Sequence, residues 1–130
     1  MNMEKTILGN DLEICRILNG MWQVAGGHGQ IDSELAIQDM EKYQELGFTT
    51  WDLADIYGPA ESLIGGFSKK TKQNFQAFTK FVPNPGPMSN SIVTCYIDES
   101  LKKMNTECID LLQFHWWDYQ DSSYLDALQH

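Results

Sequence analysis

The sequence is poor in cysteine and has no long apolar run. Its 130 residues include three cysteines, Cys15, Cys95 and Cys108, an odd number without the Cys-x-x-Cys spacing of zinc sites and redox dithiols. We therefore expect free thiols, buried or partly buried, and no metal site. No stretch reaches the roughly 20 apolar residues of a membrane helix, and the N-terminus lacks a signal-like apolar region. A cytoplasmic location is the expectation, with an organelle-targeting extension outside this sequence left open.

Basic residues are also scarce. Nine Lys and Arg stand against 18 Asp and Glu, for a formal net charge of -9. Nucleic acid and anionic membrane surfaces require concentrated positive charge, so neither is an expected partner. The 42% hydrophobic and 12% aromatic content supports a packed core and excludes disorder. The length fits one domain, but a complete eight-stranded β/α barrel typically needs about 250 residues.

Short apolar runs alternate with longer amphipathic segments along the chain, a pattern that predicts β/α units and a parallel sheet. The first strand is expected across residues 14–25, around the turn-prone Asn19-Gly20, and the glycine-rich loop with His28 that follows is interpreted as a connector. Further strands are expected at 48–54, 75–82 and 108–115. Helices are expected at 32–46, at 60–70, from Ser89 or Asn90 through Met104, and from about Ser122 or Ser123.

Ionisable side chains recur at the ends of the predicted strands. Asp52 lies near the end of the second strand, Lys80 near the end of the third and His115 at the end of the fourth, while Tyr57 follows Asp52 in a loop. Sites on parallel barrels are assembled at the carboxyl ends of the strands and in the loops after them. We therefore expect these four side chains to meet at one rim.

Their combined chemistry suggests proton transfer to a carbonyl oxygen. A tyrosine phenol is a weak acid at neutral pH, but a nearby ammonium favours the phenolate and a carboxylate beside the ammonium keeps it charged. An imidazole can hydrogen-bond the same oxygen and orient the carbonyl. Because no side chain supplies a hydride, reduction would also need a nicotinamide cofactor.

Each of these residues alone has a simpler interpretation. Asp52 and Tyr57 would more often be a turn-capping carboxylate and a half-buried ring, Lys80 a solvated charge, and His115 a core or rim histidine. The aromatic residues Trp22, Trp116 and Trp117 could line a substrate pocket or pack under the rim. The four residues at equivalent strand ends favour catalysis.

The motifs around these residues resemble those of the aldo-keto reductases. Residues 51–61, WDLADIYGPAE, are similar to the family's Asp-x-Ala-x-x-Tyr-Gly-x-x-Glu signature, and Phe78-Thr79-Lys80 to its strand-end lysine. Residues 100–104 and 109–116 are similar to its Ser-Leu-x-x-Leu block and its Asp-Leu-x-x-x-His strand. The motifs occur in order and with the family's spacing from about residue 7 to the end.

The resemblance implies roles for particular residues and a cofactor. Tyr57 would be the general acid, Lys80 and Asp52 would tune it, and His115 would orient the carbonyl. NADPH would be the cofactor more often than NADH, with Gly20, Met21, Trp22 and Asp52 as its contacts and with Trp22, His115 and Trp116 lining the substrate site. Met21 replaces the family's usual threonine, and Trp116-Trp117 replaces its common Trp-Pro.

The resemblance also implies an α/β fold of the (β/α)8 TIM-barrel family, of which residues 1–130 would supply only the first four or so β/α units, an N-terminal half-barrel. Because the cofactor's phosphates are held by the other half in this family, we expect the 130-residue chain alone to be inactive. A small carbonyl compound is the expected substrate, and self-association or a missing C-terminal half is expected to cover the open edges. The alternative function is a non-catalytic binding or regulatory subunit resembling potassium-channel β subunits.

Overall fold

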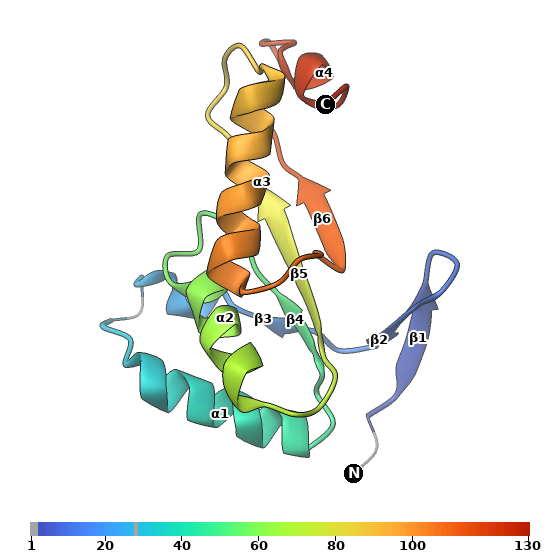
Figure 1. Ribbon diagram of the computed structural model, residues 1–130, viewed down its shortest axis with the longest axis vertical. Helices are drawn as coiled ribbons and strands as arrows, with labels where there is room; N and C mark the ends of the chain where they lie inside the picture. Colours follow the sequence, from blue (N-terminus) through green and yellow to red (C-terminus); the bar gives the residue numbers. More distant parts are fainter. Residues whose placement is uncertain (1–2, 28) are drawn as a thin grey trace.

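A parallel sheet forms the centre of the chain in a computed structural model that describes residues 3–27 and 29–130. Its four strands lie in the order β3-β4-β5-β6, and helices connect them (Figure 1). The strands are β3 (Asn19–Gly20), β4 (Thr50–Asp52), β5 (Gln76–Phe81) and β6 (Leu111–Phe114). The helices are α1 (Ser33–Glu45), α2 (Ala60–Lys70), α3 (Asn90–Met104) and α4 (Tyr124–Ala127). The predicted sequence of β/α units with a parallel sheet is therefore confirmed.

The helices α1, α2 and α3 lie along one side of the sheet, where the main core forms (Figure 1). Alternate strand residues point to opposite faces of a sheet, so one set of strand side chains meets the helices and the other set faces away from them. The core beneath the helices includes Trp51 of β4, Phe67 of α2 and Ala77 of β5. Asp52 is one position after Trp51 and Lys80 is three positions after Ala77, so both side chains lie on the opposite face of the sheet.

Helix ends follow the predicted capping chemistry. The Asp32 carboxylate accepts hydrogen bonds from the backbone N–H groups of Glu34 and Leu35 and begins α1, while Gly47, just beyond its end, has φ +95°. The Ser89 hydroxyl accepts from the Ile92 N–H and caps α3. Helix α2 has the predicted bounds, 60–70, and α4 begins next to the predicted serines.

The prediction of a strand across residues 14–25 was wrong. Only Asn19–Gly20 pairs with β4, and Trp22–Ala25 forms a 3₁₀ turn, η1. Ile14 and Cys15 belong instead to β2 (Leu12–Cys15), which forms an antiparallel hairpin with β1 (Lys5–Leu8) that stands apart from the helices (Figure 1). The Met21 N–H makes the last ladder bond, to the Asp52 carbonyl, and the Met21 carbonyl then accepts from the Val24 N–H, which turns the chain out of the sheet. A short apolar run does not distinguish such a turn from a strand.

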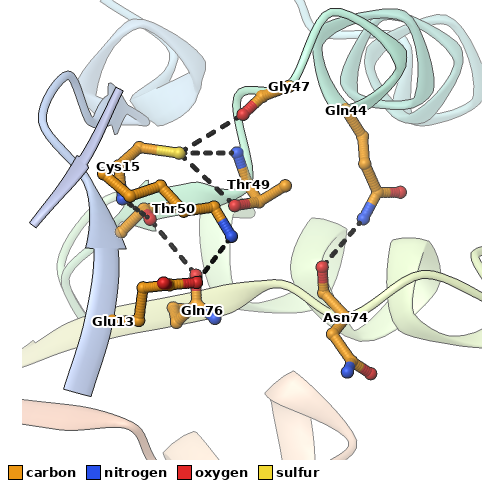
Figure 2. Close-up of polar contacts among 9 residues, drawn as sticks. Glu13, Cys15, Gln44, Gly47, Thr49, Thr50, Asn74 and Gln76 are labelled. Carbon is orange, nitrogen blue, oxygen red and sulfur yellow. Dashed lines mark hydrogen bonds and ion pairs between the residues drawn. The ribbon is translucent and has the colours of Figure 1, made fainter. Parts of the chain in front are cut away.

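Uncharged polar groups join the hairpin to the amino end of β4 (Figure 2). The Cys15 N–H donates to Thr50 Oγ1 at 2.9 Å, and Cys15 Sγ lies 3.3 Å from both the Gly47 carbonyl and the Thr49 N–H. Burial raises the pKa of the Cys15 thiol, but hydrogen bonds from Thr49 and Thr50 and the charge of Lys5 outweigh it and leave the pKa below its ordinary value. Hydrogen bonds between neutral groups therefore close this end of the sheet.

The remaining sequence expectations concern the cysteines, His28 and membrane helices. Cys15 is buried as expected, but Cys95 and Cys108 are exposed because they lie on the outer side of α3 and in the loop after it, so the expectation of buried or partly buried thiols was wrong for these two. His28 lies outside the described residues. Within the ranges 3–27 and 29–130, no helix is long and apolar enough to cross a membrane.

Candidate active site

An ion pair joins the carboxyl ends of the two central strands. Lys80 Nζ lies 2.8 Å from Asp52 Oδ1 and 2.9 Å from Asp52 Oδ2, and it also donates to the Leu53 carbonyl at 2.6 Å. The side chains are partly buried, with 15% of Lys80 and 29% of Asp52 exposed. A carboxylate at this distance holds the ammonium by charge-assisted hydrogen bonds. The structure thus brings together the predicted pair at the predicted strand ends.

Tyr57 lies beside this pair in the loop between β4 and α2. Its half-buried ring has its centroid 5.1 Å from Lys80 Nζ. A turn holds the ring in place, since the Tyr57 N–H donates to the Ala54 carbonyl at 3.0 Å. The next residue must be glycine: Gly58 has φ +51°, and a Cβ there would lie 3.3 Å from the backbone of Ala25. Three predicted residues, Asp52, Tyr57 and Lys80, therefore form one cluster.

Trp22 lies against Tyr57, and Gly20 lies beside Asp52 as its ladder partner. The Trp22 ring packs edge to face against the Tyr57 ring, with centroids 5.0 Å apart, and 54% of Trp22 remains exposed. Gly20 is exposed too, and a Cβ built on it would meet nothing within 4 Å. An exposed aromatic face and an open glycine next to the ion pair could accept a flat, partly apolar ring.

Met21 does not extend this open surface. It is 5% exposed and packs in the core with Ile37 and Met40. Its N–H already donates to the Asp52 carbonyl, and its carbonyl accepts from the Val24 N–H. Of the three residues predicted to contact a cofactor at the first strand, Met21 is therefore the one placed in the interior.

His115 directly follows β6, as predicted, and lies at the same end of the sheet. Its N–H donates to the Phe81 carbonyl at 2.9 Å, and its half-buried ring stacks on Trp117 with centroids 4.4 Å apart. In the part of the chain that the structure describes, no hydrogen bond joins this ring to Asp52, Tyr57 or Lys80. The strand order places His115 on the rim without a direct bond to the cluster.

Trp116, expected to line the substrate site, lies in the core. It is 4% exposed and packs with Phe81, Val93 and Ala127, while its Nε1 donates to the Asp118 carbonyl at 2.7 Å. Consecutive residues of an extended chain point to opposite sides, so Trp116 faces the helices when His115 faces away from them. The exposed tryptophan next to His115 is Trp117.

Gln113 reaches the ion pair although the sequence interpretation gave it no role. Its Nε2 lies 3.5 Å from Asp52 Oδ1, and it is the ladder partner of Lys80 across β5 and β6. The signal was present in the sequence: Gln113 precedes His115 by two positions, and strand residues two apart share a face. A polar side chain at position 113 is therefore expected on the same face as His115.

The arrangement is that of a barrel-type α/β protein with a candidate acid–base site at the carboxyl ends of its strands. A phenol that can give up a proton lies against an ammonium, and a carboxylate holds the ammonium in place. Negative charge that develops on an oxygen near the phenol would be stabilised by the ammonium. The arrangement is therefore suited to acid–base chemistry at an oxygen atom of a bound compound.

The chain belongs to the aldo/keto reductase family, whose sequence profile matches residues 16–130. Among curated relatives, 6-dehydroglucose reductase of Agrobacterium fabrum is 32% identical over 131 residues, which cover 87% of this chain and 43% of that protein. The chain thus spans less than half the length of this relative. The resemblance inferred from the motifs is confirmed.

Solved structures agree on the fold. A thermostable aldo-keto reductase, Tm1743, solved with the inhibitor epalrestat, matches 98% of this chain and 48% of its own with a TM-score of 0.78 and 24% identity. The aldo-keto reductase of Bombyx mori, solved with NADP, matches 99% and 45% with a TM-score of 0.74 and 20% identity. The predicted fold class, a parallel α/β arrangement that corresponds to part of a TIM barrel, is confirmed.

Proposed function

We propose that this chain supplies the first four β/α units of an oxidoreductase domain that reduces the carbonyl group of small aldehydes or ketones with NADPH. The observation that carries this proposal is the position of Lys80, which lies between the Asp52 carboxylate and the Tyr57 ring. Family membership supports the reaction type, because aldo/keto reductase relatives include reductases.

The chain's own residues provide the proton. Tyr57 gives its phenolic proton to the carbonyl oxygen as that oxygen gains an electron pair. Lys80 stabilises the phenolate that remains, and Asp52 holds the Lys80 ammonium in place. His115, on the same rim, hydrogen-bonds the carbonyl oxygen and orients it.

The residues around Tyr57 fit the nicotinamide end of the cofactor. Trp22 offers an exposed aromatic face, Gly20 leaves open space, and one side of the Asp52 carboxylate is accessible to an amide group. The bound cofactor supplies the hydride that the carbonyl carbon receives. Trp22 and His115 border the place where a small carbonyl compound would lie, and Trp117 adds an exposed apolar surface beside His115.

The proposal is tested by comparing two tyrosine substitutions. Because the 130-residue chain alone is expected to be inactive, the kinetic measurements use purified protein in which the remaining β/α units of the barrel are present. This protein is mixed with NADPH and a panel of small aldehydes and ketones, and the loss of NADPH absorbance is followed. We expect Tyr57→Phe to lower kcat/KM about 100- to 10,000-fold, the usual contribution of general acid catalysis. Tyr43→Phe is the matched control, because Tyr43 lies half-exposed on α1 and loses only a hydroxyl.

Different outcomes separate the alternatives. An unchanged kcat/KM in Tyr57→Phe would exclude Tyr57 as the acid. NADPH binding in a fluorescence titration without reduction of any tested carbonyl would favour the alternative of a non-catalytic binding subunit.

The sheet also offers two edges for further strands. Within the described ranges, β3 pairs only with β4 and β6 only with β5, and exposed apolar side chains border both edges, among them Leu18 and Leu112. We propose that these edges pair with a second copy of the chain or with a polypeptide equivalent to the rest of a barrel. Size-exclusion chromatography checks this, since a monomer that binds NADPH tightly would contradict it.

A further inference from the structure

Two acidic residues flank Tyr57 in the sequence, and both bind the strand that carries Lys80. Asp55 precedes the tyrosine by two positions. Its N–H donates to the Lys80 carbonyl at 3.1 Å, and its Oδ2 accepts from the Val82 N–H at 3.0 Å. Asp55 therefore binds the backbone on both sides of Phe81, at the point where β5 ends.

Glu61 makes the corresponding contact from the first turn of α2. Its side chain is 2% exposed, and its Oε1 accepts from the Thr79 hydroxyl at 2.8 Å. Its other oxygen, Oε2, lies 3.8 Å from Lys103 Nζ of α3, beyond hydrogen-bond distance. Thr79 is the neighbour of Lys80, so the segment that carries Tyr57 is attached to β5 both before and after Lys80.

These attachments matter because Lys80 contacts only the face of the Tyr57 ring. Lys80 Nζ directs its hydrogen bonds to Asp52 and Leu53, and it meets the Tyr57 ring only at 5.1 Å from the centroid. No hydrogen bond between the two side chains occurs in the described ranges. Their spacing is consequently set by the backbones of the loop and the strand, which Asp55 and Glu61 connect.

A carboxylate at a buried contact carries a desolvation penalty. Burial, with Glu61 as a further cause, raises the pKa of Asp55 in spite of the hydrogen bond from Val82. Among the residues described, Asp55 Oδ1 and Glu61 Oε2 are buried without a hydrogen-bond partner. A buried acid with an unsatisfied oxygen destabilises a fold, which indicates that these residues do more than support packing.

We propose that Asp55 and Glu61 are positioning residues that hold the Tyr57 loop in register with the end of β5 and so fix the distance between the Lys80 ammonium and the Tyr57 ring. Their importance for turnover rests on the proposed carbonyl reduction, whereas their effect on geometry does not. Neither residue reaches the reacting atoms, because both act through backbone and side-chain contacts to β5.

The geometric part is tested by NMR spectroscopy without any turnover. The ε-methylene protons of Lys80 experience the ring current of Tyr57, and the size of this shift reports the distance between the two groups. We expect Asp55→Ala to lose most of the shift. Asp55→Asn should restore it, because the amide oxygen still accepts from the Val82 N–H. Asp39→Ala, which removes an exposed acid of α1, is the control and should leave the shift unchanged.

Glu61 is tested from both sides of its hydrogen bond. Thr79→Val removes the donor while it preserves shape and charge, and it should reduce the Lys80 shift; Glu61→Gln keeps an acceptor and should preserve the shift. These two variants remain informative if Glu61→Ala fails to fold. A Lys80 shift equal to that of the parent protein in both Asp55→Ala and Thr79→Val would overturn the proposal.

Kinetics add a readout specific to proton transfer. A misplacement of about 1 Å can reduce a rate about 100-fold, so Asp55→Ala should lower kcat by up to about that factor while the KM for the carbonyl compound stays unchanged. Asp55→Asn should recover most of kcat. If the protein reduces no carbonyl compound even with the remaining β/α units present, the proposed function fails, yet the NMR comparison still decides whether Asp55 and Glu61 position Lys80. A reduced NMR shift with unchanged kcat in an active enzyme would overturn the catalytic part alone.

Discussion

At the amino ends of the strands, the Cys15 N–H donates to the Thr50 hydroxyl, and both uncharged groups are shielded from water, whereas at the carboxyl ends Lys80 and Asp52 form a partly exposed ion pair. Thr50 and Asp52 are only two residues apart on β4, so one short strand contributes to both. The two ends therefore differ in the chemistry of their side chains and not in the strand that carries them.

The two ends of the strands should contribute differently to stability and to chemistry. A neutral hydrogen bond in the interior contributes about 1 kcal/mol and leaves no charge to be solvated. In an ion pair, the partial desolvation of two charges opposes their attraction, so the pair by itself is weak evidence of stabilisation. Changes at the carboxyl ends should accordingly affect chemistry most, and changes at the amino ends should affect the free energy of unfolding most.

The largest expected effect is that of Lys80→Met. The substitution removes the cation beside Tyr57 and leaves the Asp52 carboxylate without its partner. We expect kcat for carbonyl reduction to fall at least about 100-fold and the stability of the protein to fall by no more than about 1 kcal/mol. Steady-state kinetics and urea denaturation measure the two effects. Lys72→Met, which changes an exposed lysine after α2, is the control, and equal activity in the two variants would contradict the assignment of Lys80.

Thr50→Val tests the amino ends and should give an intermediate effect. The Thr50 hydroxyl is buried, accepts from the Cys15 N–H and donates to Gln76 Oε1 at 3.3 Å. Valine keeps the shape but leaves both partners unsatisfied, so we expect a loss of about 1–3 kcal/mol in urea denaturation with unchanged kcat and KM. Thr94→Val, on the exposed side of α3, should have almost no effect. Normal stability together with a lowered kcat in Thr50→Val would contradict the assignment of stability to the amino ends and of chemistry to the carboxyl ends.

The smallest expected effect is a pH dependence at the carboxyl ends. Burial raises the pKa of Asp55 above its ordinary value of 3.8, so the folded chain binds this proton more tightly than the unfolded chain. Its contribution to stability is complete below the ordinary pKa and is lost as the pH rises through the raised pKa. Because an amide does not titrate, the stability of Asp55→Asn relative to the parent protein should increase with pH.

Urea denaturation at several values between about pH 3 and pH 7 measures this difference. Asp39→Asn, at an exposed position on α1, provides the baseline. A difference between Asp55→Asn and the parent protein that stays constant with pH would contradict the prediction.

The sequence predicted the features that depend on local patterns. Asp32, Gly47 and Ser89 begin and end helices through contacts within a few residues, and Asp52 and Lys80 lie at strand ends that strand alternation can locate. The first strand was misplaced because its extent depends on pairing between distant segments: only Asn19–Gly20 pairs with β4, whereas Leu12–Cys15 pairs with β1. The direction in which Met21 and Trp116 point likewise depends on distant neighbours. The contacts of Asp55 and Glu61 with β5 join separate segments, so neither local pattern nor spacing revealed them.

The three hydrogen bonds of Lys80 bear on substrate selection. An ammonium has three N–H groups, and those of Lys80 are directed to the two oxygens of Asp52 and to the Leu53 carbonyl. A bound compound would therefore receive an electric field from Lys80 but no directional contact. A field varies smoothly with distance and does not require one fixed approach, so this group should tolerate carbonyl compounds of different shapes, and discrimination among them would depend on the walls around the site.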